Sequence, residues 1–194
     1  MSEMKTDQFD ILLDSGRSAL RIALSLIPKK YGAVVLRGET CRVVYDVIES
    51  AGFKLTDDDY DAVIATQPCN MFDFEHLDIP VIEDAARFCP PGYRGVGDFT
   101  IFSFNWGKPI CMGGGGALNV KDKETREKAR MLVSETGSYW QSRLRGMMFE
   151  PSLYQLGKKI LWFYEPRYDH EPPRLMNPKL VKLLKRRTEN ETRG

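Results

Sequence analysis

The stretch that decides the fold is Thr100-Ile101-Phe102-Ser103-Phe104-Asn105-Trp106-Gly107-Lys108, which Gly113-Gly114-Gly115-Gly116 soon follows. The run from Asp98 to Phe104 is rich in β-branched and aromatic residues and lies between two glycines, which predicts a buried strand. Lys108 then follows the carboxyl end of that strand, where open α/β sheets place their ligands. A lysine at this place is a nucleophilic amine, a phosphate clamp or a solvated loop charge, and its position alone leaves all three open.

A second short apolar run, Pro80 to Ala86, contains a carboxylate at a matching position, Asp84. If the two runs are neighbouring strands, Asp84, Ser103 and Lys108 meet at one edge of a sheet. These three groups are what pyridoxal phosphate requires: a lysine for the Schiff base, a carboxylate for the ring nitrogen and a hydroxyl for the phosphate. The alternative for Asp84 is an ordinary helix N-cap after a strand.

Taken together, these motifs resemble the DegT/DnrJ/EryC1/StrS family, which comprises pyridoxal-phosphate sugar aminotransferases of the aspartate-aminotransferase fold. The five positions from Ser103 to Lys108 match the family pattern. The similarity extends more weakly back to Asp14 and forward to about Gly137. The stretches that carry it are Val81-Ile82-Glu83-Asp84-Ala85-Ala86, Gly97 to Phe104, Lys108 and Gly113 to Leu118.

The composition is that of an ordinary globular protein of 194 residues with a formal net charge of +1. This length suits one domain, with or without an appendage, and a near-neutral charge points to neither nucleic acid nor an acidic membrane. The four cysteines form no CxxC pair and the two histidines stand apart, so we expect no metal site. Reduced thiols and the lack of a signal-like or membrane-spanning segment predict a cytoplasmic protein.

Near the amino terminus, Asp14-Ser15-Gly16-Arg17-Ser18 precedes an apolar helical pattern that begins at Ala19 and is closed by Pro28. Ser15 or Ser18 can cap this helix, whose free amide groups form an anion site. The resemblance implies that Ser18 and Ala19, together with Ser103, bind the phosphate of the cofactor. An ordinary N-cap is the alternative role for Ser18.

Two residues depart from the family pattern. A strand is predicted at 33–36 and a helix at 41–50, and the junction between them carries an aromatic ring in the family that stacks on the cofactor. Cys41 occupies that position here, so the stacking is lost or weakened, while Thr40 either contacts a ligand or caps the helix. Arg87 stands where the family has a glutamine or histidine that binds the ring hydroxyl, and it brings a permanent charge.

The remaining pattern up to Gly137 predicts a buried strand at Ala62–Thr66 and an amphipathic helix from Asp122 to Val133. The link from Gln67 to Ile79 is barely long enough for a crossover, and its residues favour turns over a helix. A short crossover leaves one flank of the sheet less covered, which predicts a partner surface there.

We expect residues 1–137 to form a large domain and residues 138–194 a helical extension, either separate or packed on the same domain. Helices are predicted at Pro151–Tyr164 and Lys179–Arg187. They cover the sheet of this chain, dock a partner chain or lie on a membrane surface. The basic end has no interleaved aromatic residues, which favours a solvated face over a nucleic-acid patch.

The predicted fold is therefore α/β, a mainly parallel sheet with flanking helices, resembling the large domain of the aspartate-aminotransferase fold without its small C-terminal domain. The resemblance implies a transaminase that moves an amino group from an amino acid such as glutamate to a nucleotide-linked keto sugar, as a homodimer. The alternative is an inactive homologue that serves as a binding or scaffold subunit. A third possibility is half of a split enzyme, completed by a second subunit.

Overall fold

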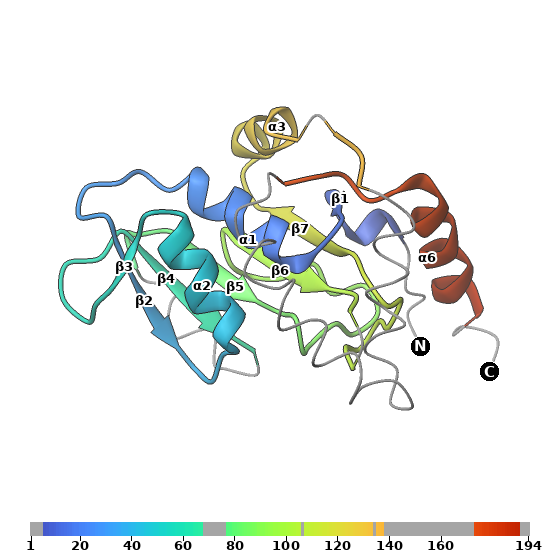
Figure 1. Cartoon of the computed structure of the whole chain (residues 1–194), viewed down its shortest axis with the longest axis horizontal. Coiled ribbons are helices and arrows are strands. Elements are labelled where there is room, and N and C mark those ends of the chain that lie inside the picture. Colours follow the sequence, from blue (N-terminus) through green and yellow to red (C-terminus); the bar gives the residue numbers. More distant parts are fainter. Residues whose placement is uncertain (1–5, 68–76, 106, 134, 138–172, 191–194) are drawn as a thin grey trace.

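The computed structural model describes residues 6–67, 77–105, 107–133, 135–137 and 173–190, and Figure 1 shows its central sheet with helices on both sides. The sheet has seven strands in the order β1-β7-β6-β5-β4-β2-β3. The strands are β1 (Ile11–Leu13), β2 (Ala33–Arg37), β3 (Lys54–Leu55), β4 (Ala62–Thr66), β5 (Val81–Asp84), β6 (Phe99–Ser103) and β7 (Gly116–Val120). The helices are η1 (Thr6–Gln8), α1 (Gly16–Ser25), α2 (Arg42–Ser50), α3 (Lys123–Met131) and α6 (Pro178–Asn190).

Five of the strands are parallel. β3, β2, β4, β5 and β6 run in the same direction, whereas β7 is antiparallel to both β6 and β1. The predicted fold class, a mainly parallel sheet with flanking helices, is confirmed. Because the strands are parallel, the carboxyl ends of β4, β5 and β6 lie at one edge of the sheet, where a site is expected.

Each face of the sheet has its own apolar core. On one face, α1 and α2 pack over side chains such as Val34, Ile64, Ile82 and Ile101. On the other face, Phe102 and Phe104 pack with residues of α6, and Leu180 and Leu184 of that helix are 1% and 0% exposed. Of the three predicted roles for the basic C-terminal helix, the described part of α6 therefore takes the first, since it covers the sheet of its own chain.

The helices begin in two different ways. Ser15 caps α1 by accepting a hydrogen bond from the N–H of Ser18, and Asp122 caps α3 in the same way through the N–H of Thr125. At α2 the N-cap residue is Cys41, whose side chain makes no capping hydrogen bond. Thr40 does not cap that helix either, so the capping role predicted as one alternative for it is wrong.

The segment 173–177 returns to the start of the sheet. The N–H of Asp14 donates to the carbonyl of Arg174 at 2.9 Å, and the N–H of Met176 donates to the carbonyl of Leu12 at 3.0 Å. On its other side, Leu175 forms an isolated bridge with Thr136. Residues 173–190 thus pack on the domain that contains β1, while the predicted division after Gly137 stays a prediction because 138–172 lie outside the described residues.

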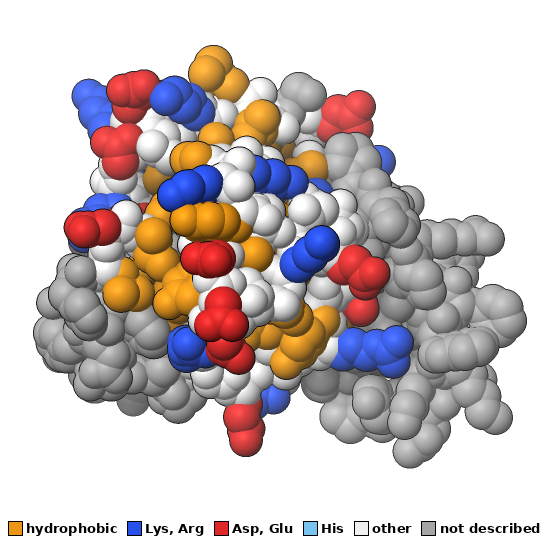
Figure 2. Space-filling view, turned by 90° about the vertical axis from the view of Figure 1, so that its left-hand side faces the viewer, with side chains coloured by type: hydrophobic (Ala, Val, Ile, Leu, Met, Phe, Trp, Pro, Cys, Tyr) orange, Lys and Arg blue, Asp and Glu red, His pale blue; other side chains and the backbone are white. Residues whose placement is uncertain are grey.

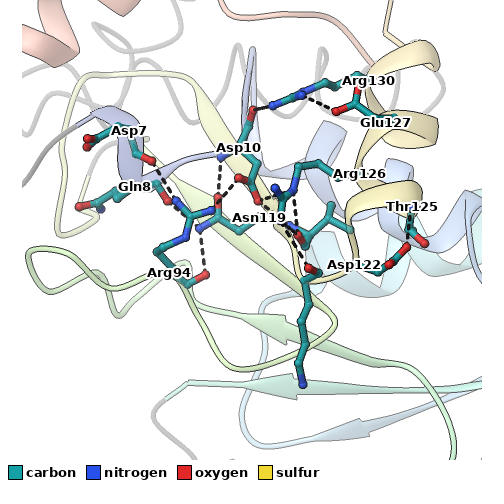
Figure 3. Close-up of polar contacts among 12 residues, drawn as sticks. Asp7, Gln8, Asp10, Arg94, Asn119, Asp122, Thr125, Arg126, Glu127 and Arg130 are labelled. Atoms are coloured by element: carbon teal, nitrogen blue, oxygen red, sulfur yellow. Dashed lines mark hydrogen bonds and ion pairs between the residues drawn. The ribbon is translucent and has the colours of Figure 1, made fainter.

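A buried carboxylate holds β1, β7 and the start of α3 together (Figure 3). The side chain of Asp10 is 8% exposed and forms ion pairs with Arg94 at 2.6 Å and with Arg126 at 3.2 Å. It also accepts the N–H of Val120, while the Asn119 side chain accepts the N–H of Asp10. This network fixes the antiparallel edge of the sheet, against which α1 packs.

A second carboxylate, Asp61, anchors the loop before β2. Its oxygens accept the backbone N–H groups of four consecutive residues, from Lys30 to Ala33, at 2.7 to 3.2 Å. Burial acts to raise the pKa of Asp61, but these donors outweigh it and leave the pKa below the ordinary value of 3.8. Charged acceptors of this kind stabilise a fold by about 1.5 to 3 kcal/mol per hydrogen bond.

Asp61→Asn is expected to lower the free energy of unfolding by about 2 kcal/mol at neutral pH. Because the folded-state pKa is lower than the unfolded-state pKa, the stabilisation is present above pH 3.8 and is lost as the pH falls through the folded-state value. Urea titrations at several pH values measure this loss. Asp57→Asn is the matched control, since the side chain of Asp57 is 83% exposed; an equal effect in both variants would contradict the prediction.

The end of the molecule at β2 and β3 carries a mixed surface. Figure 2 shows hydrophobic side chains there between acidic and basic ones, and the exposed hydrophobic residues of this region include Tyr31, Tyr45 and Leu55. No helix in the described part of the chain is long and apolar enough to cross a membrane. The predicted helix at Pro151–Tyr164 and most of the link after Gln67 lie outside the described residues, so the partner surface predicted there stays a prediction.

Candidate functional site at the carboxyl edge of the sheet

Three polar side chains follow the core residues of β4, β5 and β6 on the same face of the sheet. Side chains two residues apart on a strand point to the same face of the sheet. Thr66, Asp84 and Ser103 each lie two residues after an isoleucine of the same strand, namely Ile64, Ile82 and Ile101. Those isoleucines belong to the core under α1 and α2. The register agrees, because Thr66 pairs with Asp84 and Asp84 pairs with Ile101. The edge thus presents a carboxylate between two hydroxyls, below the two helices.

Lys108 lies in the loop directly after β6, half-buried. Burial raises the pKa of Asp84, which is 8% exposed, whereas the N–H of Ala86 and the positive charges of Lys108 and Arg87 act to lower it. The two cations are therefore close enough to act on the carboxylate. Asp84 is the last residue of β5 and no helix starts beside it, so its alternative role as a helix N-cap is wrong.

Ser103 lies against the first turn of α1. A side-chain carbon added to Gly16 would come 3.1 Å from the Cβ of Ser103 and 3.5 Å from its hydroxyl oxygen. The glycine run explains how α1 approaches the edge so closely: a Cβ on Gly116 would lie 2.5 Å from the nitrogen of Gly16. Gly115, with φ at +100°, turns the chain into β7 in a conformation that favours glycine.

Ser18 and Ala19, predicted to bind a phosphate, already have partners within the chain. The hydroxyl of Ser18 donates to the carboxylate of Asp14 at 2.6 Å, and its N–H donates to the hydroxyl of Ser15 at 3.2 Å. The N–H of Ala19 bonds the carbonyl of Ser15, and its side chain is fully buried. Ser18 and Ala19 stay predicted phosphate ligands, but an anion at this helix end would have to displace these contacts and tolerate the carboxylate of Asp14.

Both residues that depart from the family pattern are exposed. Cys41 is a free thiol at the start of α2, and Arg87 follows β5 by three positions. Arg87 acts on Asp84 through its charge. The backbone places Cys41 where α2 begins at the same edge of the sheet, because α2 follows the carboxyl end of β2.

Sequence reasoning missed the role of Glu83, which precedes Asp84 and points to the opposite face. Glu83 is 0% exposed and accepts hydrogen bonds from the side chains of Gln67, Tyr93 and Thr100 and from the N–H groups of Val96 and Gly97. This set ties the end of β5 to the loop before β6. A carboxylate inside an otherwise apolar run was the one signal of this role in the sequence.

Comparison with known proteins agrees with the predicted resemblance. Residues 65–150 match the model of the DegT/DnrJ/EryC1/StrS aminotransferase family. This matched range includes both Asp84 and Lys108. A curated relative, the uncharacterized protein MJ1066 of Methanocaldococcus jannaschii, is 33% identical over 103 residues, which cover 48% of this chain and 27% of the relative. The resemblance to this aminotransferase family is therefore confirmed, over the part of the chain that carries the candidate site.

Solved structures show the same fold. The aminotransferase TlmJ from Streptoalloteichus hindustanus is 20% identical with a TM-score of 0.56, and the alignment covers 67% of this chain and 45% of TlmJ. A putative PLP-dependent aminotransferase from Bacillus cereus is 18% identical with a TM-score of 0.54, covering 62% of this chain and 43% of the other. The chain thus spans less than half the length of these proteins and about a quarter of the curated relative.

The family match implies pyridoxal phosphate as the cofactor. The side chains at the carboxyl edge of the sheet supply most of the groups that this cofactor needs. An amine, a buried acid and a half-buried hydroxyl lie at one edge, from Lys108, Asp84 and Ser103. Asp84 is buried at a cost, which a positively charged ring nitrogen would offset. Two deeply placed hydroxyl oxygens nearby, of Thr40 and Thr66, have no hydrogen-bond partner and leave polar groups for a ligand to satisfy. The fit is poorer at Ser18, whose hydroxyl is bound to Asp14.

Proposed function

We propose that this chain forms the cofactor-binding part of a pyridoxal-phosphate-dependent sugar aminotransferase. The observation that carries the proposal is the convergence of Asp84, Ser103 and Lys108 on one edge of a mostly parallel sheet. The amino donor is an amino acid such as glutamate, and the acceptor is a nucleotide-linked keto sugar. The resemblance to the family is what supports both substrates in this proposal, and it likewise supports a site completed by a second copy of the chain or by another subunit. The free thiols of Cys41, Cys89 and Cys111 support a cytoplasmic location.

In this proposal each residue has a separate task. Lys108 would hold the cofactor through its amine and would move a proton at the reacting carbon. Asp84 would hold the ring nitrogen, Ser103 would bind the phosphate, and Arg87 would donate to the ring hydroxyl. Pyridoxal phosphate, when bound, supplies an electron sink for the bond changes at the amino carbon. The positive charge of Lys108 favours the ionised form of Asp84, which is the form that binds a protonated ring nitrogen.

Lys108→Ala tests the proposal. The wild-type chain mixed with pyridoxal phosphate is expected to absorb near the edge of the visible range and to retain the cofactor through gel filtration. Lys108→Ala is expected to lose that absorbance band completely, because it removes the amine whose charge acts on Asp84. Lys128→Ala is the matched control, since Lys128 lies on the exposed side of α3 and pairs with Glu124. A band of equal strength in Lys108→Ala would contradict the assignment.

A second function is favoured by the amino end of α1. The Ser15–Ser18–Asp14 hydrogen bonds close the predicted phosphate site from within, which suits a homologue that serves as a binding or scaffold subunit. Cofactor binding without exchange of amino groups from glutamate would support this second function. Activity that appears only when a second polypeptide co-elutes would support the split enzyme.

A further inference from the structure

The start of α2 lies at the carboxyl edge of the sheet, because α2 follows the carboxyl end of β2. The first N–H groups of any α-helix lack a partner within the helix and are bonded by caps, water or ligands. At α1 and α3 a serine and an aspartate side chain supply the cap, but at α2 the N-cap side chain of Cys41 supplies none. The N–H groups of Arg42 and Val43 therefore lie in the first turn of α2 without a cap from the Cys41 side chain, at the positive end of the helix dipole.

A buried hydroxyl without a partner lies beside this helix start. Thr66 at the end of β4 is 7% exposed, and its hydroxyl oxygen has no hydrogen-bond partner. The loop from β2 to α2 passes directly over it, since a Cβ on Gly38 would come 3.4 Å from the Cβ of Thr66. Thr40 in the same loop has a second deeply placed hydroxyl oxygen without a partner. Unpaired buried polar atoms are rare, which points to a group that is bound there.

The topology places these groups where ligands bind in open α/β sheets. From β2 the chain adds β3 on one side of the sheet, and from β4 it adds β5 and β6 on the other side. The strand order therefore changes direction between β2 and β4, which are neighbours, and ligands of open α/β sheets bind outside the carboxyl ends of the strands at such a point. Thr66 ends β4, and Thr40 follows the end of β2, so both hydroxyls lie at this point.

We propose that the start of α2, with the hydroxyls of Thr40 and Thr66, is a binding site for a small oxyanion, a carboxylate or a phosphate. Such a group accepts hydrogen bonds from both the backbone N–H groups and the hydroxyls, and the helix dipole favours its charge. The site is distinct from the predicted phosphate site at α1, where Asp14 already supplies a carboxylate. Because Asp84 is the register partner of Thr66, the oxyanion lies beside the candidate site.

Inorganic phosphate and acetate, added separately to the full-length chain, test the proposal by NMR. The amide signals of Arg42 and Val43 are expected to shift with at least one of the two anions, and the stronger response identifies phosphate or carboxylate. Thr66→Val is expected to weaken that anion's binding by about tenfold, the loss of one charge-assisted hydrogen bond. It is also expected to raise the melting temperature of the ligand-free protein, because it removes an unpaired buried hydroxyl.

Arg42→Pro and Arg42→Ala together distinguish the contribution of a backbone N–H group to anion binding from that of a side chain. Proline is tolerated at the first position of a helix, so Arg42→Pro removes one N–H donor from the site while keeping α2. Compared with Arg42→Ala, it is expected to weaken anion binding by about tenfold. Ser50→Ala, which removes a hydroxyl at the far end of α2, is the control and is expected to bind as the wild type does.

Unchanged amide signals with both anions would overturn the proposal. So would a Thr66→Val variant that binds as tightly as the wild type, since the hydroxyl would then have no part in the site. The proposal does not require the cofactor, because phosphate or acetate alone is the probe. Lys108→Ala is expected to keep the response at Arg42 and Val43, so failure of cofactor binding and failure of the oxyanion site are distinguishable.

Discussion

Gly116→Ala is expected to lower the free energy of unfolding by about 3 kcal/mol or more. The new carbon would lie 2.5 Å from the nitrogen of Gly16, 2.6 Å from the carbonyl carbon of Ser15 and 2.7 Å from the carbonyl oxygen of Phe102. All three atoms belong to the backbone, so no side-chain rotation relieves the contact, and α1 must move away from β7. Urea denaturation followed by circular dichroism measures the loss.

Gly107→Ala is the matched control for this prediction. A Cβ at Gly107 meets nothing within 4 Å, although φ there is +73°. Gly107→Ala is therefore expected to lower the free energy of unfolding by about 1 kcal/mol, which comes from the left-handed backbone conformation alone. Equal losses in Gly107→Ala and Gly116→Ala would show that the close approach of β7 to α1 is not what the glycine run provides.

Glu83→Gln is expected to lower the free energy of unfolding by about 3 kcal/mol. The substitution keeps the shape of the side chain but replaces one hydrogen-bond acceptor by a donor. The carboxylate accepts from Val96 at 2.8 Å, Gln67 at 3.0 Å and Thr100 at 3.1 Å, and also from Tyr93. A glutamine places its own amide donors against some of these donors, and the unpaired groups stay buried.

The same denaturation experiment measures this change. Glu127→Gln on the surface of α3 removes a carboxylate that pairs with Arg130 in solvent, and it is expected to leave the stability nearly unchanged. A Glu83→Gln variant as stable as Glu127→Gln would mean that the loop from Tyr93 to Thr100 is held by other contacts.

Much of the fold was predictable because the central strands are buried on both faces. Such strands are continuous apolar runs, and the predicted strand at Ala62–Thr66 has the bounds that the structure gives it. The other strands and helices predicted within the described residues differ from the structure by a few residues at their ends. β1, β3 and β7 were not predicted. β1 and β3 have three and two residues and so carry no periodic pattern, and β7 begins inside the glycine run, which is not typical of a strand. Their pairing depends on neighbours far away in the sequence.

The candidate site was predictable for a different reason. Parallel strands bring their carboxyl ends together, so residues at the ends of two apolar runs were expected to lie near one another, and Asp84 and Ser103 do end the paired strands β5 and β6. Contacts made inside the site were not predictable. The hydrogen bond from Ser18 to Asp14 joins residues that equally suit a free phosphate site. The missing hydrogen bond of the Thr66 hydroxyl could not be predicted from the sequence, because a threonine at the end of a strand is common.

The return of residues 173–177 to β1 affects how copies of this chain can associate. An edge strand with free N–H and C=O groups is a template for pairing with another chain. Here Leu12 and Asp14 already bond the returning segment, and β3 at the opposite edge has only two residues. Within the described residues, neither border of the sheet therefore offers a long ladder to a neighbour. A homodimer that used this part of the chain would form through its helices and loops and would leave the strand order unchanged.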